Sequence, residues 1–116
     1  MTDHQLLFDT ETENKYRWLA NVSGVAFKFY IPKQFVPDPP PKHINERIEA
    51  DTTRATVHAT NIRSAVKYVE EKTETVRYAP KGDPETWQIG EPYIPRTVLT
   101  QPWPRQLHIA VSWEER

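Results

Sequence analysis

Histidines are the first side chains to consider for chemistry, because imidazole is both a common metal ligand and a group that changes its charge near neutral pH. The chain has four of them, His4, His43, His58 and His108. None of them forms an HxH motif or an i,i+4 pair. A metal site usually draws at least two ligands from one element, and the chain has no cysteine. The sequence therefore predicts no metal site and no cofactor.

A pocket for a small apolar ligand is the second way in which these residues could act. His108 falls on the less apolar face of a predicted strand, where a hydrogen-bonded or solvated histidine is the commoner role. The sequence leaves open that His58, His108, Tyr30 and Tyr68 are the few polar groups of such a pocket, which is otherwise apolar. In this alternative the protein has isomerase- or hydrolase-like activity.

Large aromatic side chains stand outside any clean periodic pattern in the second half of the chain. Trp87, Tyr93 and Trp103 lie among prolines there. Such rings either cap a core or form a contact surface, and tryptophan and tyrosine are enriched at binding hot spots. These three residues are the candidate interaction surface.

An acidic motif follows the apolar residues Leu6–Phe8. The segment LLFDTET, with Asp9 and Glu11, resembles the first motif of the DEDD exonucleases, in which two carboxylates hold a pair of divalent cations. The family also needs a second aspartate motif and a third in which His or Tyr precedes another Asp. The later aspartates of this chain stand in no such context, so we interpret the motif as a solvated acidic segment.

The segment YRWLANVSGVAFKFYI, residues 16–31, organises the predicted fold. Folding it about Ser23-Gly24 makes every facing pair on one side of the ribbon apolar. The pairs are Val22/Val25, Ala20/Phe27, Trp18/Phe29 and Tyr16/Ile31. This pattern predicts an antiparallel hairpin whose apolar face needs a cover, because an isolated two-stranded ribbon is marginal in water.

Residues 61–72 are predicted to supply that cover as an α-helix. Ile62, Ala65, Val66 and Val69 follow a spacing of three and four, and Asn61 stands where an N-cap belongs. The alternation within residues 53–60 suits a strand or an extension of this helix, so the sequence leaves the choice open.

The remaining segments are shorter. Residues 74–79 and 106–114 alternate as strands, the second of them central in the sheet or paired with the hairpin. The patch Leu6–Phe8 indicates a short edge strand or an ordered arm. Residues 1–5 are interpreted as a flexible start, and residues 32–43 as a proline-rich connector. No internal repeat is recognised.

Composition limits the class of protein. The chain has 116 residues, enough for one domain over residues 1–116, with 15 basic and 16 acidic side chains interspersed. Since Lys and Arg do not cluster, no nucleic-acid partner is expected. No window reaches the 18 apolar residues or so of a membrane span and no signal sequence is evident, so we expect a soluble, cytoplasmic protein.

These observations together predict a small α+β, mainly β, domain: an antiparallel sheet with one helix packed on its apolar face. The predicted function is a non-catalytic protein-interaction module that binds a protein partner or forms a homodimer.

Overall fold

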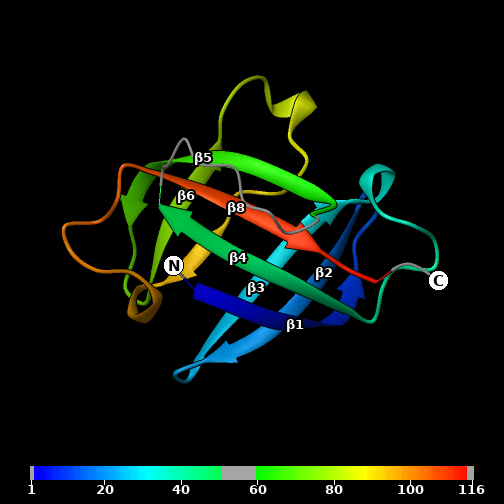
Figure 1. Cartoon of the computed structure of the whole chain (residues 1–116), viewed down its shortest axis with the longest axis horizontal. Helices are drawn as coiled ribbons and strands as arrows, with labels where there is room; N and C mark the ends of the chain where they lie inside the picture. Colours follow the sequence, from blue (N-terminus) through cyan, green and yellow to red (C-terminus); the bar gives the residue numbers. More distant parts are fainter. Residues whose placement is uncertain (1, 51–59, 115–116) are drawn as a thin grey trace.

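Alternating apolar and polar side chains run through most of the chain, and the structure arranges them in one antiparallel sheet (Figure 1). The computed structural model describes residues 2–50 and 60–114. Eight strands are paired in the order β3-β2-β1-β4-β8-β5-β6-β7. The strands are β1 (Thr2–Glu11), β2 (Lys15–Val22), β3 (Val25–Pro32), β4 (His43–Ala50), β5 (Ile62–Glu71), β6 (Thr75–Pro80), β7 (Tyr93–Pro95) and β8 (Gln106–Ser112). Three short 3₁₀ helices join them: η1 (Lys33–Phe35), η2 (Pro84–Thr86) and η3 (Arg96–Val98).

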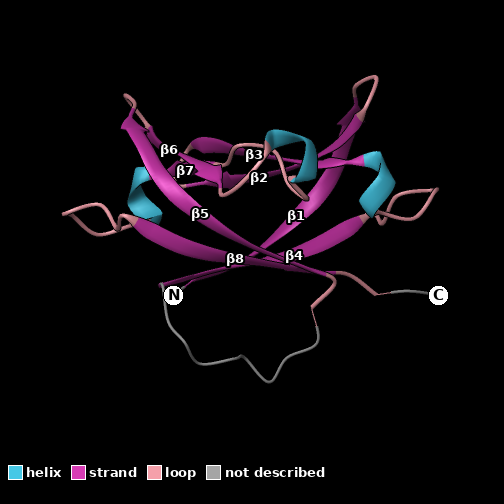
Figure 2. Ribbon diagram, turned by 90° about the horizontal axis from the view of Figure 1, so that it is seen from above, coloured by secondary structure: helices cyan, strands magenta, loops and turns pink. Residues whose placement is uncertain are grey.

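The sheet curls until its two outermost strands, β3 and β7, lie close together, so that it is an almost closed barrel (Figure 2). At this seam the backbone N–H of Gly90 donates to the carbonyl of Tyr30 over 2.8 Å. A Cβ at position 90 would lie 3.1 Å from the Cβ of Tyr30. Glycine therefore permits the close approach that brings the two ends of the sheet together.

The inside of the barrel is filled by side chains from all eight strands and from the segment before β7. The fully buried large side chains include Trp18, Phe27, Phe29, Tyr78, Ile89, Ile94 and Ile109. Edge-to-face ring contacts link several of the aromatic ones. The apolar flank of the β2–β3 hairpin is thus covered by other strands.

The predicted α+β class is wrong, because the structure is 57% strand and no α-helix forms in the described residues. The predicted helix at 61–72 is strand β5. Its side chains at Ile62, Val66 and Tyr68 take part in the core, as a period of two allows. Ile62 and Val66 are four residues apart, which fits both periods. The other two residues of the predicted helical face, Ala65 and Val69, lie on the outer side of the strand, where Val69 is 39% exposed, so apolar side chains on both sides of β5 imitate a helical spacing.

The predicted hairpin is confirmed. All four apolar pairs occur in the β2–β3 register, with the loop of two residues, Ser23 and Gly24. Both have positive φ, 51° and 82°, which defines a type I′ turn, the form whose twist matches a hairpin. The amide N–H of Gly24 also donates to the side chain of Asn21.

The other strand predictions have mixed outcomes. The strands predicted at 74–79 and 106–114 correspond to β6 and β8, and β8 is central, between β4 and β5. The Leu6–Phe8 patch belongs to the ten-residue strand β1, which is also central and includes residues 2–5. The choice between strand and helix at 53–60 falls almost wholly outside the described residues.

The strand order contains an internal repeat that the sequence analysis missed. If β1–β4 are exchanged with β5–β8, strand for strand, the result is the same strand order read from its other end. The β4–β8 ladder pairs Arg47 with Ala110 at its centre, and these two positions are equivalent in the two halves. The barrel therefore consists of two similar halves, residues 2–50 and 60–114, related by a pseudo-two-fold axis.

Equivalent contacts recur in both halves. The Trp18 indole donates to Pro41 O over 2.9 Å, and the Tyr78 hydroxyl donates to Pro104 O over 2.7 Å. Arg17 lies over the ring of Tyr30, and Arg77 over that of Tyr93. Lys33 pairs with Glu11, and Arg96 with Glu71. Cis peptide bonds, Asp38-Pro39 and Gln101-Pro102, also occupy the same place in the two connectors.

Candidate interaction face

One row of side chains crosses the outer face of the first half on four adjacent strands. The registers place Lys28 of β3 opposite Leu19 of β2, Leu19 opposite Leu7 of β1, and Leu7 opposite His43 of β4. Directly opposed residues point to the same side of a sheet, and four strands span about 14 Å. We call these four residues the Leu7 row.

The Leu7 row is apolar in its middle and exposed. Leu7 is 54% exposed, the most of any large apolar side chain in the described residues, and Leu19 is half-buried. The ends of the row, Lys28 and His43, are exposed. Two adjacent leucines on a solvated face are therefore bordered by basic side chains.

The second half shows what the same position looks like without this patch. Its equivalent row runs from Ala79 of β6 through Lys67 of β5 to Gln106 of β8. Lys67 stands in place of Leu7, and Ala79, which is buried, in place of Leu19. The same fold thus accepts a charged side chain in place of Leu7, so that this leucine is not required by the architecture.

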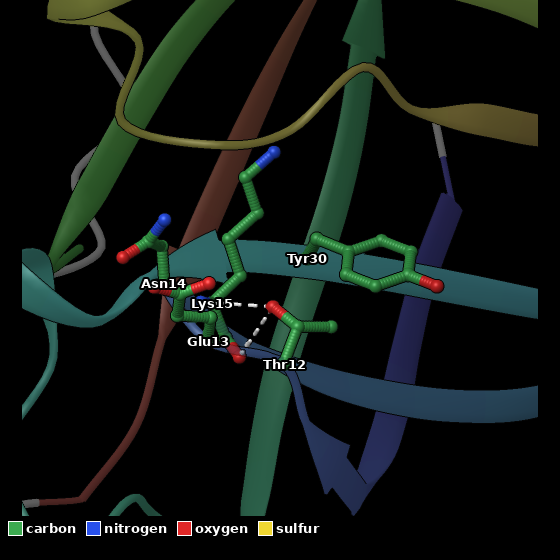
Figure 3. A pocket seen from close by; sticks show the side chains of 5 residues that line it. All are labelled: Thr12, Glu13, Asn14, Lys15 and Tyr30. Atoms are coloured by element: carbon green, nitrogen blue, oxygen red, sulfur yellow. Dashed lines mark hydrogen bonds between the residues drawn. The ribbon is translucent and has the colours of Figure 1, made fainter.

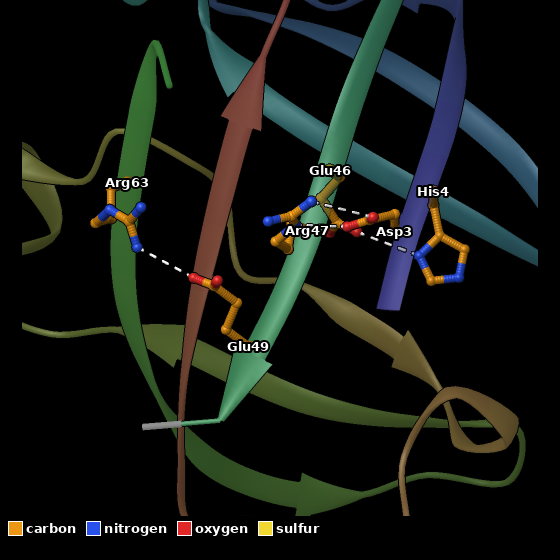
Figure 4. Close-up of polar contacts among 6 residues, drawn as sticks. All are labelled: Asp3, His4, Glu46, Arg47, Glu49 and Arg63. Carbon is orange, nitrogen blue, oxygen red and sulfur yellow. Dashed lines mark hydrogen bonds and ion pairs between the residues drawn. The ribbon is translucent and has the colours of Figure 1, made fainter. Parts of the chain in front are cut away.

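Charges beside the Leu7 row are mostly neutralised. The Arg17 Nε donates to Asp9 over 2.6 Å. The guanidinium of Arg47 makes two hydrogen bonds to Asp3, of 2.7 and 3.2 Å (Figure 4). No ion pair of Lys28 is found within the described part of the chain. Lys28 is therefore a charge of this face without an opposite charge beside it among the described residues.

Inside the barrel, under the same half, lies a titratable pair. His4 of β1 stands opposite Glu46 of β4, with 3.7 Å between His4 Nδ1 and a carboxyl oxygen (Figure 4). The ring of His4 also packs edge-on against Phe27. Glu46 is buried and its carboxyl oxygens have no hydrogen-bond partner. Burial raises the pKa of Glu46, and His4 opposes this rise only in part. The second half has Ser64 and Ile109 at these two positions.

A second buried carboxylate, Glu49, lies further along β4 on the outer face, opposite His108. Arg63 of β5 donates to one of its oxygens over 3.1 Å, and the other oxygen has no hydrogen-bond partner (Figure 4). This ion pair joins strands that β8 separates, one from each half.

A recess of about 340 Å³ opens at the β1–β2 turn (Figure 3). Thr12, Glu13, Asn14, Lys15 and Tyr30 line it. The hydroxyl of Thr12 closes the turn by accepting from the amide of Lys15 over 3.1 Å. With a single ring and no histidine, this open recess differs from the enclosed apolar pocket of the alternative hypothesis.

The residues of that alternative are not gathered in one place. Tyr30 is on β3, bonded to Arg17, and Tyr68 is on β5, packed against Tyr78. His108 is half-buried on the outer face of β8. His58 lies outside the described residues.

The predicted aromatic surface consists of three residues with separate surroundings. The Trp87 indole donates to Gly82 O, and that of Trp103 donates to Glu71 beneath Arg96. Tyr93 is 39% exposed and lies under Arg77. No ring contact links any two of the three within residues 60–114. Their role in binding stays a prediction.

The two carboxylates of the acidic motif of β1 both form ion pairs. Asp9 binds Arg17, and Glu11 binds Lys33. Nowhere in residues 2–50 and 60–114 do three His, Asp or Glu side chains come together as a metal ion would require. The carboxylates therefore have a structural use in joining β1 to its neighbours.

The comparisons give no relative: no protein-family model, no curated protein and no solved structure matches this chain. None of the helices in the described residues has the length and apolar character needed to cross a bilayer. The cytoplasmic location stays a prediction.

The Leu7 row was only partly visible in the sequence. The hairpin register already placed Leu19 opposite Lys28, on the face away from the core. Leu6, Leu7 and Phe8 form an unbroken apolar run, however, so that their order alone does not say which of them faces solvent. The β1 pairings with β2 and β4 supply that information.

Proposed function

We propose that this protein is a non-catalytic interaction module that binds another protein through the Leu7 row. The observation that carries the proposal is the exposure of Leu7 beside Leu19, at a position where the second half has a lysine. Adjacent exposed apolar side chains bordered by polar ones are typical of contact surfaces.

The shape of this face supports the same function. The row lies across β3, β2, β1 and β4 on the outer side of the barrel, and the recess at the β1–β2 turn includes none of its members. An outward-facing apolar strip with a polar border resembles the centre and rim of a protein interface more than it resembles a small-molecule site, which is concave.

Site-specific photocrosslinking tests the proposal in the cells that make the protein. A photoreactive side chain is placed at position 7 in one variant and at position 67, its structural equivalent, in the other. We expect a discrete crosslinked adduct from position 7, none from position 67, and loss of the adduct when Leu19→Lys is added. Equal labelling at both positions, or no adduct at position 7, would count against the proposal.

A further inference from the structure

The ends of the Leu7 row specify the chemistry of what binds there. Lys28 is exposed at one end and His43 at the other, on either side of two leucines. The carboxylates closest to the row along its strands, Asp3 and Asp9, are already paired with Arg47 and Arg17. The face therefore offers basic groups without acidic ones to balance them.

We propose that the occupant of the Leu7 row is an acidic segment of another protein, in which carboxylates flank an apolar side chain. This inference rests on the proposed function of the face. The apolar side chain covers Leu7 and Leu19, while a carboxylate reaches the ammonium of Lys28 and a second acidic group meets His43. Ion pairs at an exposed interface add a modest affinity, and the pair at Lys28 also orients the segment along the row.

Two other occupants fit the face less well. A second copy of the chain would place Lys28 against Lys28 or His43 of its partner, neither of which is acidic, so the charge of Lys28 would have no opposite charge across the interface. An anionic lipid surface attracts clusters of about four to eight basic side chains, whereas this row has one lysine and one histidine. Both occupants are outcomes that the experiment separates.

Selection from random peptides displayed on phage tests the inference with the intact protein. Peptides that bind the wild type are counter-selected against Leu7→Lys, which introduces the residue of the second half. We expect the surviving peptides to be enriched in Asp and Glu around Leu, Ile or Phe. Peptides selected instead for binding to the Lys28→Glu variant are expected to be enriched in Lys and Arg.

Affinities of the selected acidic peptide, measured by fluorescence anisotropy, give the size of each effect. Lys28→Glu should weaken binding about fivefold, because an attractive charge pair with a carboxylate of the peptide becomes repulsive. Leu7→Ser, which removes the apolar side chain without adding a charge that attracts the acidic peptide, should weaken it about tenfold or more, because the buried apolar contact is lost. Lys67→Glu, the matched control in the second half, should leave the affinity unchanged. The thermal unfolding curves of all three variants show whether the fold is preserved.

The outcomes separate this inference from the proposed function. Peptides that depend on Leu7 but show no acidic preference, or that tolerate Lys28→Glu, would overturn the inference and leave the face a protein-binding one. Concentration-dependent dimers that disappear in Leu7→Lys would overturn the inference and show that the occupant of the row is a second copy of the chain. Binding to vesicles that contain phosphatidylserine, again dependent on Leu7, would show that the occupant is a membrane. Failure to select any Leu7-dependent peptide, together with no adduct in the crosslinking experiment, would overturn both proposals.

Discussion

Single residues break the symmetry of the barrel, and Glu46 breaks it most sharply. A carboxyl group occupies the core position that Ile109 fills in the other half, with only His4 near its oxygens. An unpaired buried carboxylate is costly, and the protein avoids the cost by keeping the group neutral over a wider pH range. The stability of this half is therefore linked to pH.

We expect the free energy of unfolding to fall as the pH rises from the ordinary glutamate value, 4.5, towards the raised pKa of Glu46. In that range the unfolded chain ionises this group while the folded chain keeps its proton, so the folded state binds more protons and stability decreases with pH. Glu46→Gln should flatten this slope and raise stability at pH 8 by about 1 kcal/mol or more. Urea unfolding across pH 4–9 measures both. The exposed Glu13→Gln serves as control, and equal slopes for wild type and Glu46→Gln would refute the linkage.

The Tyr78 hydroxyl is a second buried group whose role can be measured. It donates to Pro104 O over 2.7 Å, as the Trp18 indole does to Pro41 O in the other half. Tyr78→Phe should lower the free energy of unfolding by about 1 to 2 kcal/mol, since the carbonyl loses its donor. Burial also raises the pKa of Tyr78 to about 12. The wild type should thus lose stability between pH 10 and 12, where the unfolded phenol ionises first, and Tyr78→Phe should not share this loss. Denaturation curves that coincide at neutral pH would show the hydrogen bond to be unimportant.

Among the elements, the β2–β3 hairpin was predicted residue by residue, because its pairs are apolar on one side and its turn is short. The turn itself offers a test. Ser23 has a φ of 51°, a conformation that asparagine adopts more readily than serine. Ser23→Asn should stabilise the fold by about 0.5 kcal/mol, whereas Gly24→Ala, at a φ of 82°, should destabilise it by about 1 kcal/mol. Thermal unfolding measures the two shifts, and shifts of the same sign would argue against a type I′ turn in solution.

Strand β5 shows why the rest of the fold was harder to predict. Ile62 and Val66 face the core while Ala65 and Val69 face outward, and apolar residues on both sides of the strand give spacings of three and four. A register shift between Tyr68 and Glu70, matched in β1 between Phe8 and Thr10, also disturbs the alternation near the end of the strand. Local periodicity does not say on which side of a strand a small apolar residue lies. The pattern therefore suggested a helix, and with it the wrong fold class.

The repeat could have been read from the sequence at one place. The segment YIPK, residues 30–33, recurs as YIPR, residues 93–96. In each, the tyrosine lies under an arginine and the basic residue pairs with a glutamate of the same half. Elsewhere equivalent positions differ, as Trp18 and Tyr78 do, and the loop before β7 is longer than the β2–β3 turn, so the spacing is not constant. The Leu7 row could not be found from the repeat either, because its leucines are not shared by the two halves: the second half has Lys67 and Ala79 at these positions.

At the scale of the whole molecule, the two halves are held together chiefly by the β4–β8 ladder, the shared core and the β3–β7 seam. A single chain segment, residues 51–59, links them in sequence. A chain cleaved at an engineered protease site within that segment should therefore stay associated as fragments of residues 1–55 and 56–116, and elute together at the mass of the intact protein, 13.6 kDa.

A substitution at Ile48, which packs against β8, tests whether the contact between the halves holds the two fragments together. Ile48 and Ile109 are opposed in the β4–β8 ladder and both are buried, so Ile48→Asp places an unpaired charge between the halves. In the cleaved protein this variant should release the fragments, whereas Leu7→Asp, on the solvent-exposed outer face, should not. Size-exclusion chromatography with light scattering distinguishes the two results. Separation of the wild-type fragments would mean that the covalent link, rather than the interface between the halves, holds the barrel closed.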